Sequence, residues 1–196
     1  MAANVDSFPP VSPYVGMAVG VVMVSTAVIA IRYAQEGAPS LSIAAWRLTL
    51  ASIILAPIVL SRHRDELSRL TRSELARAAA AGLLLAMHFA TWISSLEFTS
   101  VAASVVLVAT SPLFVGLLSP FLLQEPVPRL MYGGVLIAIV GTVVIALNGL
   151  GGGSEPLKGN LLALVGSLCV AGYMMIGRTL RRQLTLLPYI FVVYGV

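Results

Sequence analysis

Four polar side chains within one apolar stretch share the spacing of a single helical face. His88, Thr91, Trp92 and Ser95 stand at positions i, i+3, i+4 and i+7, which brings them to one side of an α-helix. An imidazole, an indole N–H and two hydroxyl groups on one face are suited to line a polar cavity and bind a solute. Helix packing is the alternative interpretation, because hydroxyl groups also bond the backbones of neighbouring helices, for about 0.6 kcal/mol each.

Arg47 is a charged residue inside a second apolar stretch of the sequence. A central arginine costs about 2.5–3.5 kcal/mol on membrane-insertion scales, so it must extend to the membrane surface or meet a partner. Glu97 and Glu36 are the acidic residues that we expect at a compatible depth. A structural ion pair, or simple extension to the surface, and direct contact with a substrate are equally good interpretations.

Pro112 lies midway along a third apolar stretch, next to Thr110 and Ser111. A proline there removes one backbone hydrogen bond and frees the carbonyl group of Val108, which kinks or breaks a helix. The freed backbone groups could face a cavity, as they do in the broken helices of transporters. The alternative is a static kink in which the hydroxyl of Ser104 or Thr110 satisfies that carbonyl.

The sequence offers little support for enzymatic or metal chemistry. It has no HExxH pair, no glycine-rich phosphate loop and no plausible Ser/His/Asp set. Cys169 is the single cysteine, so we expect neither a disulfide framework nor a cysteine metal site. The basic excess of 12 Lys and Arg over 8 Asp and Glu fits the loops of a membrane protein better than a nucleic-acid surface. We therefore expect no enzyme, no cofactor, no metal and no nucleic-acid partner.

These residues belong to long apolar elements. Hydrophobic residues make up 58% of the chain and charged residues 10%, with a mean hydropathy of +0.96. A helix that crosses a bilayer needs about 20 apolar residues, and six stretches meet that length. A seventh run, Leu186–Val196, is too short to cross. The six predicted spans are Tyr14–Ile31, Leu41–Leu60, Ala78–Leu96, Val101–Leu123, Leu130–Asn148 and Gly159–Gly177. The sequence thus predicts an all-α, polytopic transmembrane helical bundle.

The arginines predict the orientation of the bundle. Nine of the twelve basic residues fall on one side of the predicted spans, and excess Arg and Lys marks the cytoplasmic side. The N-terminus is then also cytoplasmic. The nine residues are Arg62, Arg64, Arg69, Arg72, Arg77, Arg129, Arg178, Arg181 and Arg182.

A glycine-rich linker predicts two modules. Five spans precede it, and a second copy of an odd-numbered unit must enter the membrane from the opposite side, as in inverted-repeat transporters. An offset of 146 residues places Gly20 over Gly166 and Arg32 over Arg178. We expect an N-terminal tail (1–13), a five-helix domain (14–148), a linker (149–158) and the start of a second domain (159–196). The chain is expected to stop within its second repeat.

The ordered polar and small residues of these spans resemble the EamA-type domain of the drug/metabolite transporter superfamily. The longest match runs from His88 to Leu96, then from Thr99 to Ser104, and on to Thr110-Ser111-Pro112. Shorter matches, all in the expected order, are Ser25-Thr26, Arg32-Tyr33-Ala34, Ala44-Ala45-Trp46-Arg47-Leu48, Gln124-Glu125-Pro126 and Tyr132-Gly133-Gly134. The resemblance covers one full EamA-like five-helix repeat and a truncated inverted repeat.

The resemblance implies a secondary transporter of small metabolites or drugs, in the cell membrane, as a fragment of a ten-helix protein. Its partners would be a small-molecule substrate, the lipid bilayer and the second EamA-like half, normally in the same chain; a homodimer is also possible. The alternative is a membrane channel or a non-transporting membrane module of a larger assembly. The substrate-cavity candidates are His88, Trp92, Thr91, Ser95, Arg47, Thr110, Ser111 and Pro112.

Overall fold

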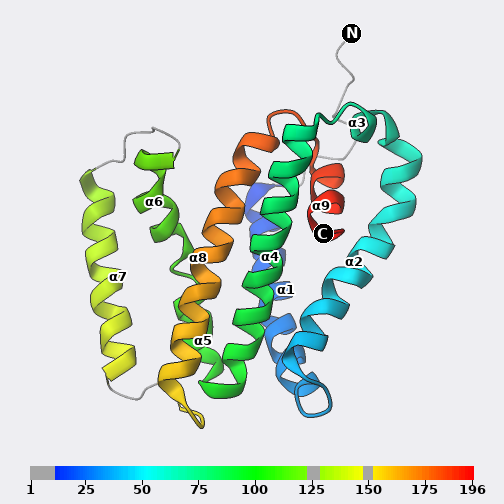
Figure 1. Ribbon diagram of the computed structural model, residues 1–196. Helices are drawn as coiled ribbons and strands as arrows, with labels where there is room; N and C mark the ends of the chain where they lie inside the picture. The colour runs from blue at the N-terminus through cyan, green and yellow to red at the C-terminus, as the bar shows by residue number, and fades with distance from the viewer. Residues whose placement is uncertain (1–11, 123–128, 148–151) are drawn as a thin grey trace. The chain divides into compact units, whose positions relative to one another are not determined.

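The computed structural model describes residues 12–122, 129–147 and 152–196, and these residues form helices and turns without a β-strand (Figure 1). Three expected features therefore lie wholly or partly outside the described residues: the N-terminal tail (1–13), the turn that begins at Gln124, and residues 149–151 of the glycine-rich linker. The all-α prediction is confirmed for the described part of the chain.

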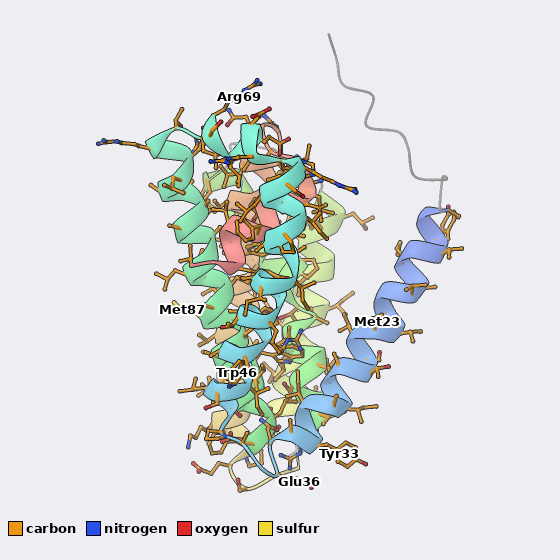
Figure 2. The ribbon with its side chains drawn as sticks, turned by 90° about the vertical axis from the view of Figure 1, so that its right-hand side faces the viewer. Met23, Tyr33, Glu36, Trp46, Arg69 and Met87 are labelled. Carbon is orange, nitrogen blue, oxygen red and sulfur yellow. The ribbon has the colours of Figure 1, made fainter. Side chains whose placement is uncertain are left out.

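The chain divides into two units, residues 1–37 and 38–196. The first unit contains helix α1 (Pro13–Ala34), whose proline occupies the first helical turn, where the missing N–H is no loss. Large apolar side chains are exposed along this helix, including Met23 and Tyr33 (Figure 2). A helix that exposes apolar groups over most of its surface is suited to contact lipid.

The second unit contains the other described helices. They are α2 (Ser40–Arg62), α3 (Arg64–Ser68), α4 (Arg72–Phe98), α5 (Val101–Val108), α6 (Ser111–Leu122), α7 (Arg129–Leu147), α8 (Pro156–Leu180) and α9 (Leu186–Tyr194). Every predicted span thus coincides with helix, with two differences. A short helix, α3, forms in the arginine-rich loop, and the fourth predicted span is two helices rather than one. In the described residues, five stretches are long and apolar enough to cross a membrane, and α7 contains a shorter apolar stretch, Leu130–Gly141.

Helices α4 and α8 lie side by side and antiparallel at the centre of the second unit (Figure 1). Small residues allow this close approach: a Cβ atom added to Gly166 would lie 3.0 Å from Thr91 Oγ1 and 3.4 Å from Trp92 Cβ. Three small residues of α8, Ala163, Ser167 and Ala171, are fully buried and form its packing face.

The remaining helices are arranged around this pair. Helices α2 and α9 pack against each other and against α4, while α5 and α6 pack against α8. Helix α7 lies at the edge of the unit, beside α6 (Figure 1). The helix pair therefore joins a helix that precedes the glycine-rich linker to one that follows it.

The two ends of the second unit are fixed by capping groups. At one end Thr71 and Glu74 form a capping box that starts α4, and Glu66 accepts hydrogen bonds from the backbone N–H (3.2 Å) and hydroxyl (2.8 Å) of Thr185, which starts α9. At the other end Gly152 and Gly153 adopt positive φ angles of 51° and 103°, which glycine accepts without strain. These glycines lie in the connection that leads into α8, and the Glu155 N–H just before α8 donates a hydrogen bond to the Phe98 carbonyl at the end of α4 (3.2 Å).

Candidate functional site

The helix break predicted at Pro112 is present. Helix α5 ends at Val108, and α6 begins at Ser111. The Val108 carbonyl accepts a hydrogen bond from Ser167 Oγ of α8 at 3.2 Å. The sequence-based alternative named the wrong partner for this carbonyl, because Thr110 bonds Leu107 O (2.6 Å) instead.

Ser167 joins the break to the central helix α8 through a second contact. Its hydroxyl also lies 3.1 Å from the hydroxyl of Thr110, and either oxygen can be the donor. Ser104, the other predicted partner, pairs with Ser95 of α4 at 2.6 Å. The Val108 carbonyl and the hydroxyls of Thr110 and Ser104 are therefore bonded within the protein.

The predicted polar face of α4 lies against neighbouring helices. His88 Nδ1 is 2.8 Å from the carbonyl oxygen of Gly166, so this nitrogen carries the proton and donates it to α8. Ser95 bonds Ser104 of α5, while Thr91 bonds the carbonyl of Met87 on its own helix (2.8 Å). His88 and Ser95 are thus engaged in helix packing, and a role in lining a substrate cavity stays a prediction.

Trp92 is the member of this face with an unused polar atom. Its indole ring stacks on the imidazole of His88, with centroids 5.6 Å apart and an interplanar angle of 14°. The side chain is 6% exposed, and its Nε1–H has no hydrogen-bond acceptor among the described residues. Buried donors are nearly always paired in proteins, so this N–H is available to a ligand or water.

Arg47 contacts an aromatic ring instead of the carboxylate that the sequence suggested. Its guanidinium carbon lies 4.8 Å from the centroid of Phe89, which is the geometry of a cation–π interaction. Glu97 accepts a hydrogen bond from Ser40. Glu36 belongs to the first unit, whose placement relative to Arg47 is not described.

Two cavities flank the helix break. One, of about 240 Å³, lies between α6, α7 and α8 and includes Thr110 in its lining. The other, of about 370 Å³, is lined by Pro112, Val115, Met131, Met174, Met175 and Arg178. Of the predicted site residues, Thr110 and Pro112 therefore line cavities. Ser111, which starts α6, is buried.

Two polar residues of α8 were not among the predicted site residues. Ser167 belongs to the small-residue packing face of α8, and its hydroxyl bonds the helix break. Asn160 is buried and accepts a hydrogen bond from the Thr99 hydroxyl at 2.8 Å. An amide side chain inside an apolar span is a signal that could have identified Asn160. No group of three or more metal-ligating side chains occurs among the described residues.

Comparison with known proteins gives a consistent assignment. Residues 11–147 match the EamA-like transporter family. The chain is 24% identical over 178 residues to a protein of Bacillus subtilis (strain 168) named uncharacterized transporter YetK. That match covers 89% of this chain and 54% of the Bacillus protein, so the chain spans about half the length of the curated relative. No solved structure matches significantly.

Proposed function

The chain belongs to the EamA-like transporter family, and we propose that it forms part of a secondary transporter of small metabolites or drugs. It is a multi-pass membrane protein, with five stretches of described helix that can cross a bilayer. The proposed location is the cell membrane, with the arginine-rich end of the second unit in the cytoplasm.

The broken helix between α5 and α6 is the observation that carries this proposal. Irregular backbone at membrane depth is tolerated where it is buried in protein or lines a cavity. Here the break bonds α8 through Ser167, and Thr110 and Pro112 line cavities on either side of it. Broken helices take part in the substrate sites of many secondary transporters, so we propose that this break lines part of the substrate pathway.

We propose that a second EamA-like half completes the transporter. The family match ends at residue 147, before α8 and α9 begin, and the chain spans about half of its curated relative. Helix α8 corresponds to α1, and α9 to α2, under the offset of 146 residues. Alternating access then comes from movement of one half against the other around the central site.

Counterflow in proteoliposomes tests the proposed function. The full-length gene product is reconstituted with unlabelled solute inside and labelled solute outside, using radiolabelled amino acids, nucleosides and organic acids and one fluorescent cation. A transporter that alternates between two states accumulates label transiently above equilibrium, whereas a channel only equilibrates it. We expect counterflow with at least one solute from the full-length product and none from the 196-residue chain. Equilibration without counterflow would identify a channel, and equal flux from the shorter chain would show that no further half is needed.

His88→Asn separates a transport role of His88 from its packing role. The asparagine amide can replace Nδ1–H as donor to the Gly166 carbonyl, while the ring stacked on Trp92 is lost. We expect close to normal amounts of folded protein and at least about tenfold lower counterflow. Leu83→Met, on an exposed part of α4, is the matched control and should keep normal flux. Normal flux in His88→Asn would leave only the packing interpretation.

A further inference from the structure

Arg47 lies well inside the membrane part of the second unit. It follows Ser40, the first residue of α2, by seven positions, which is about 10 Å along a helix axis. The Ser40 hydroxyl contacts the Glu97 carboxylate and the carbonyl of Ile93 (3.4 Å) on the antiparallel helix α4. Seven positions further along α2, the facing part of α4 is therefore near residues 86–90.

The guanidinium group of Arg47 stays at that depth. It lies over the ring of Phe89, which is at the level of Arg47's own backbone and not at the outer end of the helix. Arginines that avoid the membrane interior extend their side chains toward the surface. Arg47 does not, so extension to the surface does not explain this charge.

Arg47 forms no ion pair with a carboxylate of the second unit's described residues. The contact with Phe89 uses one face of the planar guanidinium group, and its N–H groups lie along the edge, where they can still donate. Glu97, the acidic residue nearest in depth, bonds Ser40. A cation at this depth is costly without a counter-charge, which favours the binding of an anion beside it.

A second donor without an acceptor adjoins the same aromatic ring. The ring centroids of Phe89 and Trp92 are 6.2 Å apart, and Trp92 carries the buried, unpaired Nε1–H. His88 does not accept from it, because the two rings are stacked and His88 Nδ1 donates to Gly166. Helices α2 and α4 therefore present a cation and an N–H donor around one apolar ring, and no hydrogen-bond acceptor for either is found among the second unit's described residues.

We propose that Arg47 binds the carboxylate group of a small organic anion, and that this anion is the transported substrate. The proposal rests on the proposed transport function. A guanidinium edge pairs with a carboxylate through two parallel, charge-assisted hydrogen bonds. Phe89 and Trp92 supply apolar surface for the hydrocarbon part of the same molecule.

The charge at this position fits a carboxylate better than a phosphate group. One guanidinium balances one negative charge, whereas a phosphate monoester carries up to two at neutral pH. The described basic residues other than Arg47 lie at or near helix ends, in α1, in the arginine-rich loops and at Lys158. A lipid phosphate at the membrane surface would also have to reach about 10 Å inward to meet Arg47.

Ligand-induced stabilisation of the purified full-length protein tests this inference without measuring transport. Thermal unfolding is followed with three matched pairs of probes: phenylacetate and phenylacetamide, 4-methylvalerate and its amide, and succinate and succinamide. A ligand that binds the native state raises the unfolding midpoint in proportion to its occupancy. We expect the carboxylate of at least one pair to raise the midpoint while its amide has no effect.

Variants of Arg47 assign that effect to the residue. In Arg47→Gln the carboxylate concentration that gives half of the shift should rise at least about tenfold, because a charge-assisted bond is lost. Arg47→Lys keeps the charge and should retain part of the preference for the carboxylate over its amide. This variant distinguishes loss of the charge from a folding defect in Arg47→Gln. Arg62→Gln, at the exposed end of the same helix, is the matched control and should behave as the unsubstituted protein.

Two results would overturn the inference: no pair that distinguishes carboxylate from amide, or a preference that persists in Arg47→Gln. Counterflow with a neutral or cationic solute and no carboxylate binding would support the transport function. It would contradict the proposal that the substrate is an organic anion. Carboxylate binding at Arg47 without counterflow of any solute would support the anion site and contradict the transport function.

Discussion

At the scale of single residues, hydroxyl groups replace the backbone hydrogen bond that Pro112 removes. Ser167 donates to the freed Val108 carbonyl and also contacts Thr110. In hydrocarbon a freed carbonyl cannot turn to water, so its partner has to come from a neighbouring helix. Ser167 therefore stabilises the break in addition to packing α8 against α5 and α6.

Ser167→Ala tests this role through stability. We expect the variant to lose about 1 kcal/mol of unfolding free energy, because the Val108 carbonyl is left without its donor. Titration with sodium dodecyl sulfate in mixed micelles measures this loss.

Ser119→Ala is the matched control, since that buried hydroxyl bonds only the Val115 carbonyl of its own helix (2.7 Å). It should cost less than half as much. Equal losses in the two variants would mean that the contact between the break and α8 contributes nothing specific.

At the scale of elements, the close approach of α4 and α8 determines which polar groups meet. Gly166 allows the close approach of the two helices, and its carbonyl accepts a hydrogen bond from His88. Near the N-terminal end of α8, the Thr99 hydroxyl donates to Asn160. The interface therefore depends on glycine at Gly159, Gly166 and Gly172, where an added Cβ would lie 3.0 Å or less from a residue of α4 or its C-cap, and on buried polar pairs.

Gly166→Leu should disrupt this interface. Its Cβ alone would lie 3.0 Å from Thr91 Oγ1, so the larger side chain forces the helices apart, at a cost of about 1–3 kcal/mol. The same unfolding titration measures the effect. Gly133→Leu on α7 is the control: no atom lies within 4 Å of its Cβ position, and we expect a change within about 0.5 kcal/mol. Similar costs at the two positions would contradict a specific close contact at Gly166.

At the scale of the whole molecule, the second unit gathers its arginines other than Arg47 at one end. Arg69 lies at that end (Figure 2), where the Glu66–Thr185 hydrogen bonds hold α3 against the start of α9. The C-terminal ends of α2 and α8 and the N-terminal end of α4, which carry these arginines, lie at that end of the unit (Figure 1). The opposite end carries Lys158, which pairs with Glu155 at 3.4 Å.

Cysteine labelling tests which end faces the cytoplasm. In intact cells, with Cys169 first replaced by serine, Arg69→Cys should resist a membrane-impermeant maleimide, and Ser154→Cys should react. Ser154 is exposed and avoids the positive φ angles of the neighbouring glycines. Permeabilisation should make Arg69→Cys reactive, which controls for a buried thiol. The reverse labelling pattern would invert the membrane orientation.

The sequence by itself determined the helical spans, the helix break and the gathering of the arginines. Each depends on local chemistry: about 20 apolar residues span a bilayer, and a proline cannot donate the helical bond. It also determined that His88, Thr91, Trp92 and Ser95 share one face, because helical spacing is fixed.

Only the tertiary structure decided what that face meets and which groups pair across helices. Spacing along one helix does not reveal its neighbour, so the contacts of His88 with Gly166 and of Ser167 with Val108 could not be predicted. The same limit applies to Arg47, where sequence suggested an acidic partner and the structure places Phe89. These pairings depend on how α8 packs against α4 and α5, and that packing is set by the fit of many side chains at once.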